Sequence, residues 1–156
     1  MKAVNFPWHW QEPLTDTMRL VPLKPFSKQA QAIAGRLQEE ISASGMDVDV
    51  LEVARCQNKR LFVKYDLERT SVAAARGGNC NERWLWHGTD ALDSIITDGF
   101  NTFAYASMAF NAYGFGNYFA PDAKLSDFFI RDARGGFNVV YFLLFSPIQT
   151  STFNND

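Results

Sequence analysis

The run FNVVYFLLF, residues 137–145, constrains the fold of this chain more than any other stretch. It carries no charged side chain, yet it is far shorter than the roughly 20 apolar residues that a helix needs to cross a bilayer. A short and nearly continuous apolar run is typical of a strand that is covered on both faces. We therefore expect residues 137–145 to form a central strand.

An amphipathic helix is predicted near the start of the chain. In residues 27–45 the apolar side chains fall on one stripe at helical spacing, with Ser27 as the N-cap and Gly45 just past the end. Residues 46–57 then alternate and are rich in β-branched side chains, a pattern that favours a half-buried strand. We expect a helix followed by a strand in this part of the chain.

A second helix is expected after this strand. Residues 59–76 carry apolar side chains at near-helical spacing, Asn58 precedes them as an N-cap, and Gly77 and Gly78 end the pattern. The basic side chains of this region are most simply interpreted as a solvated helix face: Arg55, Lys59, Arg60 and Lys64.

His87 is one of two histidines in the chain and lies between two short elements. Residues 83–86 favour a strand, and the following segment TDALDSIITDG favours a short helix capped by Thr89 or Asp90. His87 and Gly88 are therefore predicted at a strand-to-helix junction. Taken alone, His87 is most simply interpreted as a hydrogen-bonded structural histidine.

The next stretch has no clean hydrophobic period. Residues 101–117 read as a long loop, and loops of that length in a compact domain are typical of binding segments. Beyond the loop the chain should turn at Pro121 and form a helix from Asp122 until Gly135 and Gly136 end it. The polar tail predicts no further element.

Composition and charge exclude several classes of protein. Hydrophobic residues make up 47% of the chain and charged residues 21%, which is typical of a folded globular domain. The net charge of −2 gives no broad attraction to nucleic acid or anionic lipid. The N-terminus has no signal-peptide pattern, and no apolar stretch is long enough to span a membrane. Cys56 and Cys80 lack metal-ligand spacing, so we expect reduced thiols, no metal, no membrane partner and an intracellular location.

Three pieces of the sequence share an order and spacing that chance seldom produces. They are His87-Gly88-Thr89, then Gly99-Phe100, then Gly114-x-Gly116-x-Tyr118-Phe119-Ala120 with Ser126 eight positions past the tyrosine. Together they resemble the catalytic domain of the poly(ADP-ribose) polymerase family. Upstream, VARCQNKRLFVKYDLER looks like the strand-plus-helix element of that family. The resemblance covers roughly residues 16–146.

This resemblance implies an α+β chain with the ADP-ribosyltransferase fold, a split pair of antiparallel β-sheets with helices packed outside. It also implies transfer of ADP-ribose from NAD+ to a protein or other acceptor, with release of nicotinamide and without a metal. We expect residues 1–156 to be a single catalytic domain that is truncated at its C-terminus.

The resemblance further implies roles for individual residues. Gly88 would grip the nicotinamide carboxamide with its N–H and C=O, because no Cβ intrudes. The Ser126 hydroxyl would donate to the carboxamide oxygen, and Tyr118 and Phe129 would sandwich the ring. His87 would hydrogen-bond a hydroxyl of the adenosine ribose. The residues expected to bind NAD+ are His87, Gly88, Thr89, Tyr118, Phe119, Ala120, Ser126 and Phe129, and His87 and Tyr118 are also expected to take part in catalysis.

One catalytic position of the family has no counterpart in the sequence. Elongating members carry a glutamate on a late strand, but no glutamate follows Glu82 here. The resemblance therefore favours transfer of a single ADP-ribose unit. The alternative is an inactive module that keeps the NAD+ or ADP-ribose site and only binds. An RNA 2′-phosphotransferase would need a basic face, which a net charge of −2 disfavours. The late carboxylates are interpreted as caps and solvated charges: Asp122, Asp127, Asp132 and Asp156.

Overall fold

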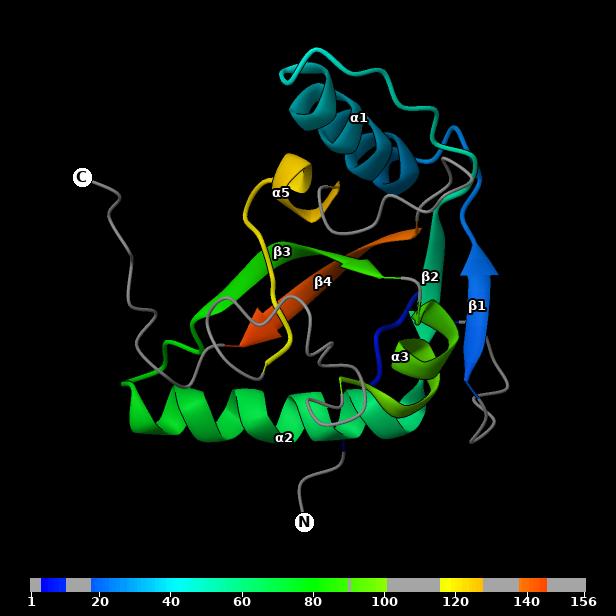
Figure 1. Cartoon of the computed structure of the whole chain (residues 1–156). Helices are drawn as coiled ribbons and strands as arrows, with labels where there is room; N and C mark the ends of the chain where they lie inside the picture. The colour runs from blue at the N-terminus through cyan, green and yellow to red at the C-terminus, as the bar shows by residue number, and fades with distance from the viewer. Residues whose placement is uncertain (1–3, 11–17, 90, 101–115, 128–137, 146–156) are drawn as a thin grey trace, which may run out of the picture.

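Two pairs of antiparallel strands, each built from segments far apart in the sequence, form the framework of the computed structural model (Figure 1). The structure describes residues 4–10, 18–89, 91–100, 116–127 and 138–145. The helices and strands in chain order are β1 Arg19–Pro22, α1 Lys28–Ser42, β2 Ala54–Gln57, α2 Lys59–Ala75, β3 Glu82–Thr89, α3 Leu92–Asp98, α5 Ala123–Asp127 and β4 Asn138–Phe145.

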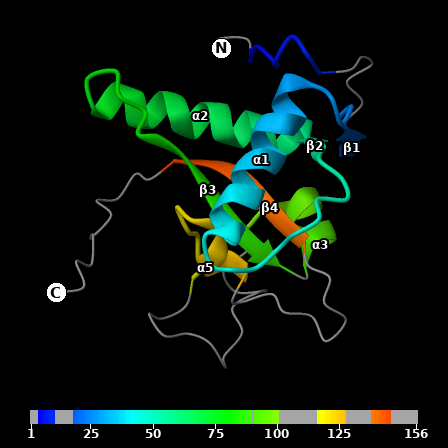
Figure 2. The ribbon, with the colours of Figure 1, turned by 90° about the horizontal axis from the view of Figure 1, so that it is seen from above.

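Helices lie on both sides of the longer strand pair. β3 and β4 are paired along their whole length, with Glu82 opposite Phe145 and Thr89 opposite Asn138. Figure 1 shows α1 and α5 above this pair and α2 below it, and the view from above in Figure 2 also places α5 against α1. The predicted α+β class, with helices packed outside antiparallel strands, is confirmed.

The first helix is confirmed, because local signals define both of its ends. The Ser27 side chain accepts a hydrogen bond from the N–H of Ala30 at 3.3 Å, as an N-cap should. α1 ends at Ser42, and Gly45 follows with a positive φ of 80°.

The second helix is confirmed for the same reason. The Asn58 Oδ1 atom accepts a hydrogen bond from the N–H of Leu61 at 3.1 Å. α2 runs to Ala75, and Gly77 and Gly78 leave the helix with φ values of 63° and 97°.

The predicted strand over residues 46–57 is only partly correct. β2 occupies its last positions, whereas residues 46–53 belong to no strand. Val48 and Val50 nevertheless pack against the core, so the alternation of apolar side chains reports burial on one side rather than strand pairing. β1, which we did not predict, is a short strand whose partner among the described strands is β2.

β3 is longer than predicted, and this changes the setting of His87. The strand continues past Trp86 to Thr89, because β4 pairs with it as far as Asn138. His87 and Gly88 therefore lie within a strand. The prediction that they occupy a strand-to-helix junction is wrong, because pairing with a distant segment extends the strand.

The turn after β3 also differs from the prediction. The N-cap of α3 is Ala91, which makes no side-chain cap, and Asp90 lies outside the described residues. The Thr89 Oγ1 atom accepts a hydrogen bond from the N–H of Ala91 at 2.9 Å. Thr89 thus closes a tight turn before α3 instead of capping it. Gly99 ends α3 with a φ of 85°, as predicted.

The C-terminal predictions are confirmed where the structure describes them. α5 begins at Ala123, and the Asp122 Oδ1 atom accepts a hydrogen bond from the N–H of Lys124 at 3.0 Å. β4 is a strand, but β3 is its neighbour among the described strands, so its central placement stays a prediction. Most of the predicted loop, residues 101–115, and the rest of the helix after α5 lie outside the described residues.

A small apolar core joins three elements that are distant in sequence. It contains Leu37 and Ile41 from α1, Trp86 from β3 and Ala123 from α5. Trp86 is 1% exposed and Ala123 is fully buried. Burying these side chains together attaches α5 to β3 on one side and to α1 on the other.

Of the basic residues interpreted as a solvated helix face, Arg55 lies in β2 and the other three lie on α2. The Arg55 guanidinium donates to the carbonyl oxygen of His9 at 3.3 Å. The Arg60 side chain is 55% exposed on α2, and its guanidinium also donates to the carbonyl oxygen of Thr97 at 2.8 Å and to the Asp98 carboxylate at 3.1 Å. The interpretation is wrong for Arg55, because this residue is not on a helix.

Candidate functional site

His87 lies in a cluster of aromatic rings from three segments. Its ring centroid is 5.1 Å from that of Phe100 and 5.2 Å from that of Phe119, and the two phenylalanine centroids are 4.8 Å apart. β3 supplies the histidine, Phe100 follows the Gly99 cap of α3, and Phe119 precedes α5. The imidazole is therefore held where these three segments meet.

The His87 imidazole has a defined tautomer. Its Nδ1 atom lies 2.8 Å from the carbonyl oxygen of Tyr118. A carbonyl oxygen can only accept, so Nδ1 carries the hydrogen and donates it. Burial lowers the pKa of His87 below its ordinary value, and the hydrogen bond to Tyr118 offsets part of that shift. The imidazole is therefore neutral at pH 7, and its Nε2 atom is an acceptor.

The main chain of Gly88 is directed away from β4. In an antiparallel strand the N–H and C=O of one residue point to the same side, and the side alternates from residue to residue. Trp86 donates its N–H to the Ala120 carbonyl at 2.7 Å and accepts from the Ala120 N–H at 2.9 Å. Two residues further along β3, Gly88 directs its own N–H and C=O to this same side.

The segment that faces Gly88 is the one that carries Tyr118. The bridge between Trp86 and Ala120 is antiparallel, so the chain runs back from Ala120 past His87 toward Gly88. The hydrogen bond between His87 and Tyr118 confirms this direction. Tyr118 is 37% exposed, whereas Phe119 packs inward against His87. The main chain of Gly88 therefore lies opposite the segment that carries the partly exposed Tyr118.

For the other predicted site residues the structure gives a position in the fold, or it does not describe them. Thr89 is buried at the end of β3, where its hydroxyl accepts from the turn. Ser126 lies on α5, one helical turn after Ala123. Phe129 lies outside the described residues, as does Gly114. The structure thus brings His87, Gly88, Tyr118, Phe119 and Ala120 together.

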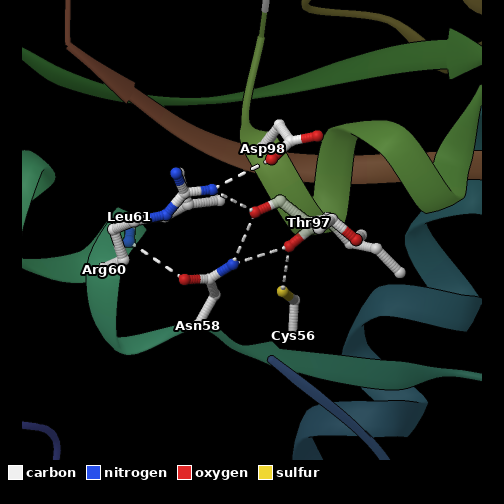
Figure 3. A network of polar contacts seen from close by, with 7 residues as sticks. Cys56, Asn58, Arg60, Leu61, Thr97 and Asp98 are labelled. Carbon is white, nitrogen blue, oxygen red and sulfur yellow. Dashed lines mark hydrogen bonds and ion pairs between the residues drawn. The ribbon is translucent and has the colours of Figure 1, made fainter. Parts of the chain in front are cut away.

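A residue that we predicted only as a helix cap supports this site from the α3 side. The Asn58 side-chain amide donates to the carbonyl oxygens of Ile96 at 2.9 Å and Thr97 at 3.0 Å (Figure 3). Its oxygen caps α2 at the N–H of Leu61. Asn58 is 6% exposed. We call these contacts of Asn58 the Asn58 anchor.

The Asn58 anchor joins the start of α2 to the end of α3. α3 leads through Gly99 to Phe100, which contacts His87. The sequence signals the cap, because Asn before an apolar helix is a local pattern. It gives no signal for the bonds to α3, which depend on how the chain folds back.

Neither membrane spans nor metal sites were found in the parts of the chain that the structure describes. No helix there is long and apolar enough to cross a membrane. Within the same ranges, no group of three or more His, Cys, Asp or Glu side chains could hold a metal ion.

Most of the chain is similar in sequence to known proteins. The family model of the poly(ADP-ribose) polymerase catalytic domain matches residues 27–150. The human protein named "Protein mono-ADP-ribosyltransferase PARP14" is 31% identical over an alignment of 152 residues that covers 94% of this chain. The chain spans 8% of the length of that relative.

The matched residues run from α1 to β4 and include the His87, Gly88 and Tyr118 segments. The α+β arrangement of helices around antiparallel strands is that of the ADP-ribosyltransferase fold. On these grounds the chain belongs to the poly(ADP-ribose) polymerase catalytic-domain family.

Proposed function

We propose that this chain binds NAD+ beside Gly88 and transfers a single ADP-ribose unit from it to an acceptor, with release of nicotinamide. The observation that carries the proposal is the direction of the Gly88 N–H and C=O, which face the Tyr118 segment rather than β4. A carboxamide has an acceptor oxygen and a donor NH2 in one plane. The N–H and C=O of one strand residue match this pattern of donor and acceptor.

The nicotinamide ring would stack on Tyr118. This ring is exposed enough to be covered by a ligand, and an aromatic contact contributes roughly 0.5–1.5 kcal/mol beyond the area that it buries. Ser126 on α5 is proposed to donate to the carboxamide oxygen, and Phe129 to cover the second face of the ring. Thr89, Phe119 and Ala120 would line the site through packing and main-chain contacts.

The neutral state of His87 suits the proposed reaction. Breaking the bond between nicotinamide and ribose builds positive charge on the anomeric carbon, as in glycoside hydrolysis. A neutral imidazole does not repel that charge, whereas an imidazolium would. Its Nε2 atom can accept a hydrogen bond from a ribose hydroxyl while Nδ1 donates to Tyr118.

Three wider features belong to this proposal. The human relative is named as a mono-ADP-ribosyltransferase, which supports transfer of one ADP-ribose unit rather than of a polymer. We extend the proposal to residues 1–156 as a single catalytic domain with a protein acceptor. Both Cys56 and Cys80 are free, which supports a reducing, intracellular compartment.

Labelled NAD+ tests the proposal directly. The protein should bind NAD+, release nicotinamide and transfer label to itself or to an added protein. Gly88→Val should abolish binding, because the new side chain enters the space beside Tyr118. His87→Ala should weaken binding by about tenfold, the loss of one buried hydrogen bond. Gly35→Val is the matched control, because a Cβ at Gly35 on α1 meets no atom within 4 Å. Unchanged NAD+ affinity in both site variants would reject the assignment.

The second candidate is a module that binds NAD+ or ADP-ribose without turnover. It is favoured because the contacts proposed for His87, Gly88 and Tyr118 hold the ligand and do not require turnover. Tight binding of NAD+ and of benzamide, a nicotinamide mimic, with no release of nicotinamide would establish this function. Release of nicotinamide that Gly88→Val abolishes would exclude it.

A further inference from the structure

Two charged side chains on α1 bond to the main chain of the segment that carries the proposed nicotinamide contacts. The Arg36 guanidinium donates to the carbonyl oxygen of Pro121 at 3.1 Å. The Glu40 carboxylate accepts from the N–H of Ala123 at 2.7 Å. The same two side chains bond to each other at 2.6 Å. We call this set of contacts the Arg36–Glu40 anchor.

The main-chain groups of Pro121 and Ala123 determine which side chain of the anchor must donate a hydrogen bond and which must accept one. The Pro121 carbonyl can only accept a hydrogen bond, so it requires a donor such as Arg36. The N–H of Ala123 belongs to the first turn of α5 and has no partner within that helix, so it requires an acceptor such as Glu40. A helix cap is thus supplied to α5 by a side chain of α1. The two charges are consequently not interchangeable.

An apolar layer beneath the anchor holds the same segment. Ala123 is fully buried against Leu37 and Ile41 of α1. The Arg36 guanidinium carbon lies 5.6 Å from the centroid of the Trp86 ring, and Trp86 exchanges two main-chain hydrogen bonds with Ala120. Figure 1 shows α5 between α1 and β3, and Figure 2 shows α5 beside one end of α1.

The anchored residues lie between the two proposed contacts for nicotinamide. The chain is fixed at Ala120 by β3 and at Ala123 by Glu40. Tyr118 comes two residues before the first of these points, and Ser126 comes three residues after the second. A shift at either point would therefore move one proposed ring contact relative to Gly88.

We infer that Arg36 and Glu40 are positioning residues that set the distance between Gly88 and the Tyr118–Ser126 segment without touching the substrate. This inference rests on the proposed function. It assigns to α1 a role in nicotinamide affinity that an ordinary salt bridge between residues one helical turn apart would not have.

A charge exchange separates these two roles. The double variant Arg36→Glu with Glu40→Arg keeps an ion pair on α1, in the orientation that is better for a helix because the acidic residue comes first. It places a carboxylate beside the Pro121 carbonyl and a guanidinium beside the Ala123 N–H. The double variant Asp66→Arg with Arg69→Asp is the matched control, because both members lie on α2 and bond to each other.

The measurements are amide hydrogen exchange, benzamide affinity and urea unfolding. The exchanged pair on α1 should raise the exchange rate of the Ala123 amide and weaken benzamide binding, each by about tenfold, which is the effect expected from losing one strong hydrogen bond. The Leu61 amide, held by Asn58, should exchange as before. The urea midpoint should fall, but by less than in Asn58→Ala. Glu40→Gln, which keeps an acceptor for Ala123, should restore most of the affinity that Glu40→Ala loses.

The outcomes distinguish this inference from the proposed function. If the native protein binds neither NAD+ nor benzamide, the proposed function fails. If it binds both and the exchanged variant binds them equally well, the positioning role fails alone. The positioning role also fails if the control pair on α2 weakens benzamide binding as much as the pair on α1 does.

Discussion

His87 lies between two anchors. Each anchor fixes one of the segments that contact His87, but the two use different polar groups. On one side the Asn58 anchor fixes the end of α3, which leads to Phe100. On the other side the Arg36–Glu40 anchor fixes the start of α5, which follows Tyr118 and Phe119. Both join a helix to the main chain of an element distant in sequence.

The anchors differ in burial and in charge. Asn58 is neutral and 6% exposed, whereas the side chains of Arg36 and Glu40 are charged and 39% and 20% exposed. Removing the buried Asn58 amide takes a donor from the carbonyls of Ile96 and Thr97, which then keep only the Cys56 thiol and the Arg60 guanidinium, and losing buried hydrogen bonds is costly. A partly exposed ion pair can exchange its bonds for water and is screened by salt. We therefore expect the Asn58 anchor to contribute mainly stability and the Arg36–Glu40 anchor mainly position.

Truncation of Asn58 should give the largest effect. Asn58→Ala removes the cap of α2 and both bonds to α3, and it should lower the free energy of unfolding by about 2–4 kcal/mol. Urea unfolding measures this. Asn58→Ser keeps a capping oxygen but cannot reach α3, so it should recover only about 1 kcal/mol. Glu40→Ala should cost less stability than Asn58→Ala. The reverse order would contradict the comparison.

Substitution of Gly99 should give the next largest effect. Gly99 has a φ of 85°, and a Cβ at this position would lie 3.0 Å from the Leu61 Cδ2 atom. Gly99→Ala should therefore lower the free energy of unfolding by roughly 1–2 kcal/mol through backbone strain alone. Gly45→Ala, which has a similar φ but nothing nearby, isolates the contact with Leu61. Equal losses in both variants would show that this contact costs nothing.

A structural feature of this chain could be predicted from the sequence when the residues that form it are close in sequence, and not when they are distant in sequence. The ends of α1 and α2 were predictable, because Ser27 and Asn58 act on residues of the same helix. The extension of β3 through His87 and Gly88 was not, since it depends on β4. The strand predicted over residues 46–53 was wrong because burial on one face does not require a paired neighbour.

In the candidate site, too, some residues could be predicted from the sequence and others depend on contacts between distant segments. The resemblance of their pattern to that of the poly(ADP-ribose) polymerase family was enough to predict that His87, Gly88 and Tyr118 belong to one site. The residues that hold their segments in place, Arg36, Glu40 and Arg60, carry no such signal. Their side chains are ordinary for a helix surface, and only the fold brings main-chain partners to them.

Raising the salt concentration should change amide exchange at one anchor and not at the other. This effect should be smaller than the effects of the substitutions above. Raising the ionic strength from about 0.1 M to about 1 M shortens the screening length from about 10 Å to about 3 Å. The Ala123 amide, held by the Glu40 carboxylate, should exchange about twofold faster. The Leu61 amide, held by the neutral Asn58, is the internal reference and should not respond. A parallel rise at both amides would instead indicate a general loosening of the fold.

The smallest predicted effect concerns the pH dependence of stability. The fold lowers the pKa of His87, so the unfolded chain binds more protons than the folded one below about pH 6.5. The contribution of the neutral imidazole is present above that pH and is lost as the pH falls through the lower folded pKa. The stability difference between the native protein and His87→Gln should therefore shrink from pH 7.5 to pH 5. The pKa of His9 is lowered too, but this affects both proteins equally and cancels.

The central claim is that the Gly88 main chain grips a carboxamide beside Tyr118, and an NMR titration tests it most directly. Benzamide and acetophenone have the same ring and carbonyl, but only benzamide has the NH2 donor that would bond to the Gly88 carbonyl. We predict that benzamide shifts the Gly88 amide signal in a saturable way and that acetophenone binds about tenfold more weakly. No shift at Gly88, or equal affinity for the two ligands, would contradict the account.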